Sequence, residues 1–307
     1  MSFHRKPKLQ RLFIAWFIWP VEAVFLYLLI GLLKLMPRRL ASAAMGGLFR
    51  LVGPYTRWHK RSRSHLQFAL PHLTSEEQDA ALQDMWNNLG RTAGEYFHIK
   101  SYIDDEALQI TGLSHIEAHK GGILMTGHFG NWEIIPLLMH LTGLGGGLIF
   151  RPMNNPLTSR IFTNRLSMGN IEIFEKGRAG AKGLVKTVAK GRLMLSLTDQ
   201  TLREGDPVPF FGMDVQTATS HFKVAAKAGV PIYPVRVRRL KGDHHHLEIM
   251  APIFIARDAD AKQIFAHARA MNEMFADWIK ETPGQWMWPH RRWGKELAKD
   301  AHNSEHA

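Results

Sequence analysis

Short apolar runs alternate with longer helical stretches from Gly122 onward, and this alternation limits the possible folds more than any other feature. The apolar runs have the length of buried strands and cover residues 123–126, 148–150, 171–174, 193–197, 231–237 and 247–250. Helical periodicity covers residues 132–141, 157–168, 181–190, 220–228 and 259–280. Strands separated by helices favour βαβ units. The sequence therefore predicts an α/β fold, with a mostly parallel central sheet flanked by helices.

Local signals add three expectations. Thr74 and Glu77 have the spacing of a capping box, and apolar residues follow at helical spacing, so a helix is expected to begin there. The segment between the strand at 193–197 and the helix at 220–228 is expected to be a loop. Lys241-Gly242-Asp243 predicts a turn, and the three histidines at 244–246 are expected to lie in a solvated hairpin.

A long apolar segment lies near the N-terminus. Residues 12–33 carry a single charge, Glu22, and about 20 apolar residues suffice to span a bilayer. Pro20 should kink a helix here, and Glu22 needs a partner if it lies in lipid. A tilted span, a helix lying in the membrane surface, a buried core helix and a cleaved signal peptide all remain open.

Nearly all of the net charge of +12 also lies at this end. Residues 1–64 contain twelve Lys and Arg and one acidic residue. Because these cations alternate with aliphatic stretches and no nucleic-acid-binding motif follows, anionic lipid headgroups are the expected partner and nucleic acid is not. The absence of cysteine from the 307 residues excludes a disulfide scaffold, a thiolate nucleophile and an iron–sulfur cluster.

The loop after the first expected strand has the strongest chemical signal. It contains His128 and Glu133, with glycines at 127 and 130 that permit a tight bend. Across a strand-to-helix turn, the carboxylate of Glu133 can hold one imidazole nitrogen while the other faces a substrate, as a general base requires. The alternative is a structural histidine beside a helix cap.

Several blocks together resemble one family. The segment HFGNWE resembles the H-x4-D/E (here HX4E) signature of glycerolipid-type acyltransferases, and its glutamate, glycine, asparagine and tryptophan look most like the late (lauroyl/myristoyl) acyltransferases of lipid A biosynthesis. Further blocks similar to that family are residues 150–156, 199–200, 208–212, 218–219 and 285–293. The resemblance covers roughly residues 10–295.

The resemblance implies an O-acyltransferase of the inner membrane, with its catalytic domain facing the cytoplasm. It would move a fatty acyl chain from acyl carrier protein to a hydroxyl of a lipid A precursor. It also implies a membrane anchor at 1–40, an acyltransferase domain at 41–295 and a polar tail at 296–307. No cofactor and no metal are expected, and a glycerolipid or phosphatidylinositol mannoside acceptor is the alternative.

The same resemblance assigns roles to individual residues. The catalytic residues would be His128 as base, Glu133 as its orienting carboxylate, Arg165 as an oxyanion stabiliser and Asp199 as a further site residue. Arg151 is a rival to Arg165 that could instead bind an acceptor phosphate. Asn131, Thr219 and Arg151 would contact substrate. Backbone N–H groups at the start of the 131–141 helix are a second possible oxyanion site, and a hydrolase or a non-catalytic adaptor with this fold stays open.

Overall fold

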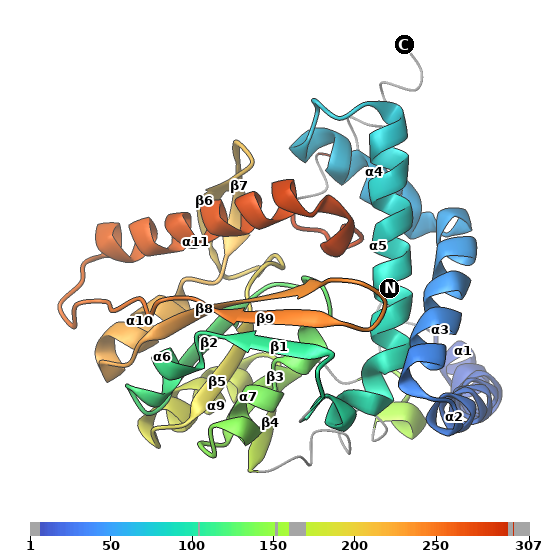
Figure 1. Cartoon of the computed structure of the whole chain (residues 1–307), viewed down its shortest axis with the longest axis horizontal. Helices are drawn as coiled ribbons and strands as arrows, with labels where there is room; N and C mark the ends of the chain where they lie inside the picture. The colour runs from blue at the N-terminus through green and yellow to red at the C-terminus, as the bar shows by residue number, and fades with distance from the viewer. Residues whose placement is uncertain (1–6, 104, 151–152, 160–169, 294–296, 298–307) are drawn as a thin grey trace.

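The computed structural model describes residues 7–103, 105–150, 153–159, 170–293 and 297. Its centre is a seven-stranded sheet with the order β1-β9-β8-β2-β5-β3-β4 (Figure 1). Every neighbouring pair is parallel except β8 and β9, which are joined by the turn at Lys241-Gly242-Asp243. The predicted mostly parallel α/β sheet is therefore confirmed. The strands are β1 (Leu108–Thr111), β2 (Gly122–Thr126), β3 (Gly146–Phe150), β4 (Ile171–Glu175), β5 (Leu193–Leu197), β8 (Ile232–Arg239) and β9 (His245–Ile249).

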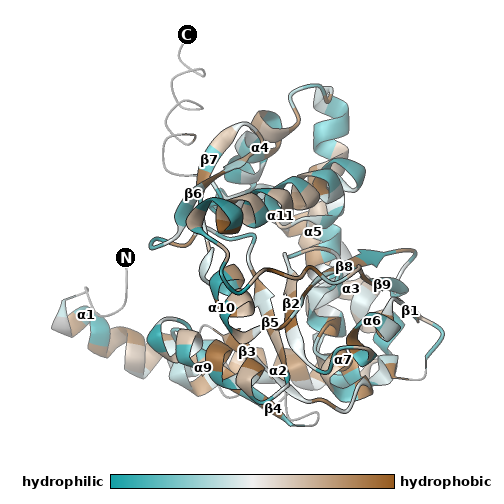
Figure 2. Cartoon of the chain, turned by 90° about the vertical axis from the view of Figure 1, so that its left-hand side faces the viewer, coloured by the Kyte–Doolittle hydropathy of each residue, from teal (hydrophilic) through white to brown (hydrophobic). Residues whose placement is uncertain are grey.

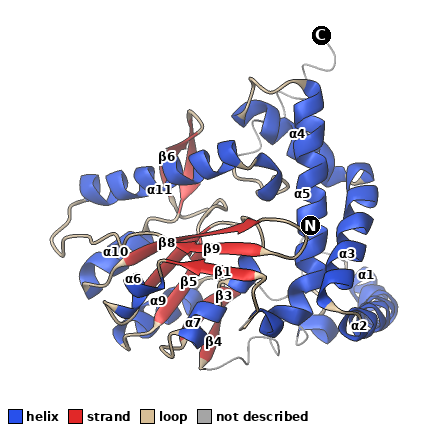
Figure 3. Ribbon diagram, viewed as in Figure 1, coloured by secondary structure: helices blue, strands red, loops and turns tan. Residues whose placement is uncertain are grey.

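Helices cover both faces of this sheet, as Figure 3 shows. Ile123 and Met125 of β2 belong to one core with α9 (Arg178–Ala189), α10 (Ser220–Ala228) and α11 (Ala261–Glu281). Leu124 points to a second core with α6 (Leu113–Glu117) and α7 (Leu137–Leu141). The central strand is buried along its whole length, which explains why it is a continuous apolar run in the sequence.

A helical layer stands at one end of the sheet. The predicted capping box begins α5 (Ser75–Glu95), and Thr74 and Glu77 make both of its hydrogen bonds. α5 packs along α3 (Arg38–Val52) and meets α4 (Arg57–Ala69) near its start (Figure 1). Gly90 and Gly94 permit the close approach of α3, since a Cβ at either position would overlap the α3 backbone carbonyls of Met45 or Ala41.

Two expectations are corrected. The segment before α10 is not a plain loop, because β6 (Asp206–Phe210) and β7 (Met213–Thr217) form an antiparallel hairpin that packs against α11. The histidines at 244–246 are not uniformly solvated, because the His245 side chain is fully buried. The helix expected at 132–141 is divided into a single turn, η5 (Trp132–Ile134), and α7. Of the helix expected at 157–168, only the first residues lie within the described part of the chain.

The N-terminal apolar segment is helical, and its first turns extend beyond the body in Figure 2. α1 (Lys8–Phe13) passes through a π-helical turn, η2 (Ile14–Ile18), into α2 (Trp19–Leu35). Pro20 lies in the first turn of α2, directly after the π-helical residues. A proline lacks the N–H that continues an α-helical ladder, so the wider turn before it relieves the conflict.

The segment is not a core helix. Leu9–Leu35 is long and apolar enough to cross a membrane, and only 11% of its most hydrophobic window is buried. Trp16, Phe17, Phe25 and Leu28 are exposed, whereas Leu33 packs against α3. Exposed apolar surface of this extent marks a membrane or protein contact. Glu22 has the partner it needs, because Nδ2 of Asn155 lies 3.3 Å from its carboxylate.

Candidate active site

His128 lies in the loop at the carboxyl end of β2, where ligands of open α/β sheets bind. The loop bends at Gly130, whose φ of 52° is left-handed. A Cβ at this position would also overlap the carbonyl oxygen of Val237. Only glycine satisfies both the dihedral angle and the close approach to β8, so this residue fixes the path of the loop.

Asp199 meets His128 because two parallel strands end side by side. β2 and β5 pair with Thr126 opposite Leu197, so the residues two positions further on reach the same edge. Nδ1 of His128 lies 2.8 Å from Oδ1 of Asp199, and the His128 backbone N–H donates to Oδ2 at 2.9 Å. The Asp199 side chain is fully buried, while that of His128 is 12% exposed. A buried carboxylate thus orients a histidine that remains accessible.

The carboxylate at Nδ1 of His128 is that of Asp199, whereas the sequence favoured Glu133 as the carboxylate that orients the imidazole. A catalytic role of Glu133 stays a prediction. Glu133 lies half-buried in η5, where its backbone N–H donates to the side chain of Asn131 at 3.2 Å. Spacing along the chain favoured Glu133 because it is local, whereas Asp199 is 71 residues away and reaches His128 only through strand pairing.

The other nitrogen of His128 faces Gln200. Nε2 of Gln200 lies 3.1 Å from Nε2 of His128 and 2.9 Å from Nε2 of His290. The two imidazole rings are 4.8 Å apart, and Trp132 packs edge-on against His128 at 4.9 Å. Sequence reasoning placed residues 285–293 in a family block but gave His290 no role. The structure brings it into van der Waals range of the expected base.

The C-terminal block is the core that holds this site. Trp286, Trp288 and Trp293 are fully buried, which decides between the core, membrane-interface and acyl-groove positions that the sequence left open for them. The indole N–H of Trp286 donates to Oδ2 of Asp199 at 2.9 Å. The buried guanidinium of Arg292 donates to the backbone carbonyl of Gln200 at 3.1 Å. Residues after α11 therefore fix both Asp199 and Gln200.

Electrostatics favour an ionised Asp199. Burial raises the pKa of this carboxyl, but the charge and hydrogen bonds of His128 and the proximity of His290 outweigh burial and hold the pKa below its usual range. Burial has the opposite consequence for His290 and lowers its pKa to about 3, with His128 as a further cause. His290 is accordingly neutral at physiological pH.

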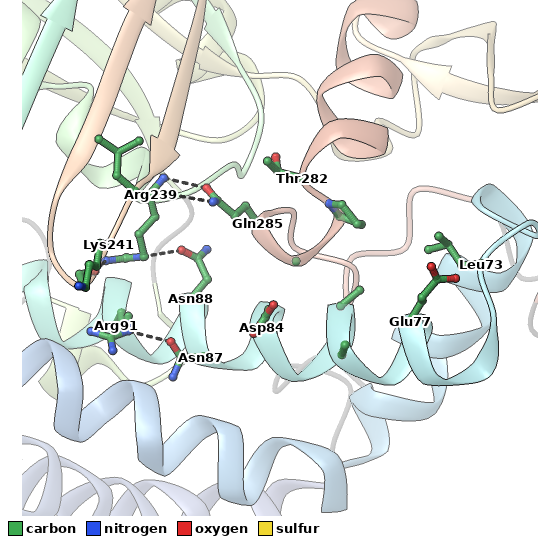
Figure 4. A pocket seen from close by; sticks show the side chains of 16 residues that line it. Leu73, Glu77, Asp84, Asn87, Asn88, Arg91, Arg239, Lys241, Thr282 and Gln285 are labelled. Atoms are coloured by element: carbon green, nitrogen blue, oxygen red, sulfur yellow. Dashed lines mark hydrogen bonds between the residues drawn. The ribbon is translucent and has the colours of Figure 1, made fainter.

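A buried polar cluster supports the loop from behind. Asn131 is fully buried and donates to Glu95 of α5 at 2.7 Å. Glu95 also forms an ion pair with Arg239 and lies 3.1 Å from Nε2 of His245. Arg239 in turn bonds Asn88 and, through its backbone, Gln285 (Figure 4). The buried side chain of Asn131 therefore holds the loop in place through α5.

The same cluster clamps Gly130 from two sides. Nδ2 of Asn88 donates to the carbonyl of Gly130 at 3.0 Å, and the backbone N–H of Gly130 donates to the carbonyl of Gln285 at 2.9 Å. The sequence gave no role to Asn88, Glu95, Arg239 or Gln285. The available signal in the sequence was a polar residue, such as Asn88 or Glu95, on the face of α5 that is otherwise buried.

The remaining predicted site residues are placed as follows. Thr219 is the N-terminal cap residue of α10, and its hydroxyl donates to Asp206 of β6. Arg151 and Arg165 lie outside the described residues. The backbone N–H groups of His128, Phe129, Gly130 and Glu133 are bonded within the protein, so they are not free oxyanion donors. Within the described part of the chain, no group of three or more potential ligands could hold a metal ion.

The N-terminal apolar helix α2 reaches the strand end beside this site. Asn155, in the segment that follows β3, donates to the carbonyl of Trp19 at 3.0 Å and caps the N–H of Leu157. The hydroxyl of Tyr27 donates to the carbonyl of Leu157 at 3.2 Å. α2 is therefore attached to the segment that leaves the carboxyl end of the sheet, the edge that carries His128.

Comparisons with known proteins identify the family of this chain. The sequence model of the family described as "Bacterial lipid A biosynthesis acyltransferase" matches residues 4–295. The chain is 28% identical over 191 residues to the "Lipid A biosynthesis lauroyltransferase" of Escherichia coli (strain K12), a match that covers 60% of this chain and 61% of that relative. The aligned part is thus less than two thirds of the relative's length.

A solved structure is also similar. The 1-acyl-sn-glycerophosphate (LPA) acyltransferase PlsC from Thermotoga maritima matches 80% of this chain and 99% of its own, with 13% identity and a TM-score of 0.38. The family match covers residues 4–295, from the N-terminal helix through the His128 loop to the buried tryptophan block. The chain belongs to the bacterial lipid A biosynthesis acyltransferase family.

Proposed function

We propose that this chain transfers a fatty acyl group from an acyl carrier protein thioester to a hydroxyl of a lipid A precursor. The observation that carries the proposal is His128, held at Nδ1 by a buried, ionised Asp199 and partly accessible at the end of β2. A histidine in this state can take a proton from a hydroxyl. The family match and the lauroyltransferase relative support the choice of substrates.

The reaction follows from these positions. Nε2 of His128 takes the proton of the acceptor hydroxyl while the hydroxyl oxygen attacks the thioester carbonyl carbon. The tetrahedral intermediate then collapses, the carbon–sulfur bond breaks, and the proton on His128 passes to the departing thiolate. Asp199 stabilises the imidazolium that exists between these steps. The products are the ester and the free thiol, and no acyl-enzyme is formed.

The remaining roles stay proposals. Arg165 would stabilise the oxyanion and Arg151 an acceptor phosphate, since guanidinium groups suit both tasks. Glu133, in the turn after His128, would be a second carboxylate that helps to orient the base. Thr219 and Asn131 would shape the substrate site through Asp206 and Glu95.

The location is also proposed. Residues 1–40 would anchor the chain in the inner membrane, and the domain at 41–295 would face the cytoplasm, where acyl carrier protein is found. The exposed apolar face of α1 and α2 and its attachment to Asn155 support this arrangement. Of the expected polar tail, 296–307, all residues except Leu297 lie outside the described part of the chain.

Mass spectrometry of lipid A tests the proposal. Cells that lack the gene should accumulate a precursor lighter by one acyl chain, and the wild-type gene should restore it while His128→Ala should not. An unchanged lipid A together with altered glycerophospholipids would show that the acceptor is a glycerolipid. Release of free fatty acid by the purified protein in place of ester formation would show a hydrolase.

A further inference from the structure

We infer that Gln200 is a positioning residue that fixes the tautomer of His128 and occupies the place of the acceptor hydroxyl in the resting enzyme. The inference rests on the proposed role of His128 as general base. It starts from one amide nitrogen, Nε2 of Gln200, which lies within hydrogen-bond distance of the Nε2 atoms of His128 and His290.

The chemistry of the amide group determines where the imidazole protons are. An amide NH2 has two donor hydrogens and does not accept, so both imidazole Nε2 atoms must present lone pairs to it. His128 then carries its proton on Nδ1, where Asp199 accepts it. Gln200 and Asp199 therefore favour the same tautomer, with the proton on Nδ1 and a lone pair on Nε2. A base that acts through Nε2 needs this tautomer.

The opposite orientation of the amide would be costly. The oxygen of Gln200 would then face both Nε2 atoms, and each would need a proton. With Nδ1 already bonded to Asp199, His128 would be a cation, and a second cationic or Nε2-protonated ring would lie 4.8 Å away. Burial lowers the pKa of His290 to about 3, which agrees with a neutral ring.

Gln200 is held by its backbone, and its half-buried side chain borders a groove. Its carbonyl accepts from the buried Arg292, which is also bonded to Thr217 and Asn272. Its side chain, with that of His290, lines a groove of about 450 Å³ whose other walls include Trp58, Trp86 and Met287. His128 is not among the residues that line this groove.

A hydroxyl that gives its proton to Nε2 of His128 must lie about 2.6–3.2 Å from that atom. The Gln200 amide already lies there, at 3.1 Å. The acceptor must therefore displace the amide, which can keep its bond to His290 as it turns toward the groove. In the resting enzyme the amide keeps the lone pair of the base unprotonated and in place.

Other charged groups surround His128 and His290 and influence the pH dependence of the enzyme. Asp199 contacts His128 from the end of β5, and Glu133 follows in the same loop. Arg61 and His65 of α4 act on His290, and Arg292 bonds the Gln200 backbone. A carboxylate at position 200 would accept from both histidines and favour the His128 cation.

The test is the pH profile of kcat/KM for the full-length enzyme with Gln200→Glu. An added negative charge in contact raises the pKa of the base, so the acidic limb should move to higher pH by about 1–3 units. Gln200→Met removes the donor that favours the neutral base, so the limb should move in the same direction but by less than with Gln200→Glu. Gln67→Glu on the exposed face of α4 should leave the limb in place. A Gln200→Glu profile that coincides with wild type would overturn the inference.

A second measurement does not depend on activity. In ¹⁵N-labelled full-length enzyme, NMR should show His128 with its proton on Nδ1 and an unprotonated Nε2, and the Nε2 of His290 unprotonated as well. His128→Asn and His290→Gln assign the signals. A proton on Nε2 of His128 in the wild-type enzyme would contradict the role of Gln200 whatever the variants do. Retention of activity in His128→Ala would instead reject the proposed function, so the two failures are distinguishable.

Discussion

Asp199 receives two hydrogen bonds from His128, one from Nδ1 at 2.8 Å and one from the backbone N–H at 2.9 Å. A carboxylate that holds both the ring and the backbone of the same residue fixes the loop and the imidazole together. Because Trp286 donates to the same carboxylate, the C-terminal block is part of this arrangement. The accessible side of the ring is thereby left for chemistry.

Replacement of His128 by Ala should lower turnover by about 10²–10⁴-fold, the usual contribution of a general base. The measurement is the rate of ester formation by the purified protein. His72→Ala, at an exposed position, is the matched control and should keep wild-type activity. Near-normal turnover of a folded His128→Ala enzyme would rule out this base.

Asp199→Asn should cost more activity than Glu133→Gln. The amide presents either a donor to Nδ1 or a weaker acceptor, so it disturbs the tautomer that the base needs and no longer stabilises the imidazolium. A loss of about 10²–10⁴-fold is expected in kcat for Asp199→Asn, and a smaller one for Glu133→Gln. The reverse order would return the orienting role to Glu133.

Gly130→Ala should destabilise the protein and abolish activity. The added Cβ meets the carbonyl of Val237 and forces an L-residue to a φ of 52°. Gly143→Ala separates the two causes, because Gly143 has a φ of 68° but nothing within 4 Å of its Cβ position. We expect about 1–2 kcal/mol of strain at Gly143 and a clearly larger loss at Gly130, measured by denaturant unfolding.

Glu95→Gln should reduce the free energy of unfolding by about 3–5 kcal/mol, because it leaves the buried Arg239 without its counter-charge. Burial raises the pKa of Glu95, but Arg239 and His245 outweigh burial and hold the pKa below its ordinary value of 4.5. This stabilisation is therefore complete above pH 4.5 and is lost as the pH falls toward the lower, folded-state pKa.

The difference in unfolding free energy between wild type and Glu95→Gln should consequently shrink on acidification below pH 4.5. Glu76→Gln, exposed in the first turn of the same helix, is the control and should change stability by no more than about 0.5–1 kcal/mol. A constant difference across this pH range would mean that Glu95 is not the ionised partner of Arg239.

Removal of residues 1–36 should weaken membrane association without abolishing it. The exposed apolar surface of α1 and α2 is lost, but Arg57 and Lys60 on α4 remain exposed to anionic headgroups, at about 1 kcal/mol per residue. High salt screens this remainder and should strip the truncated protein from membranes while the full-length protein stays bound. Full-length protein in the soluble fraction at high salt would contradict a membrane anchor.

A variant of the full chain avoids the loss of packing against α3. Phe25→Lys with Leu28→Lys puts two charges on the exposed face of α2, where burial in lipid is costly. It should shift the protein toward the soluble fraction. Gln67→Lys, which adds a charge to the exposed face of α4, should not. Equal partitioning of the two variants would show that this face of α2 does not enter the bilayer.

The sequence by itself determined the local features. The apolar run at 123–126, the capping box at Thr74 and the alternation of strands and helices predicted the central strand, the start of α5 and the parallel sheet. These are set by periodicity and by contacts between residues a few positions apart. His128 was found in the same way, from a glycine-flanked loop after a strand.

Tertiary structure decided what meets His128. Asp199, Gln200 and His290 are 71, 72 and 162 residues away, and they converge because β5 pairs with β2 and the buried tryptophan block packs against both strand ends. Sequence spacing therefore selected Glu133, the carboxylate nearest along the chain. Glu95 and Arg239 likewise form an ion pair only because α5 crosses the end of the sheet. Strand register and core packing bring distant side chains together, and neither is encoded in the spacing of the residues that they join.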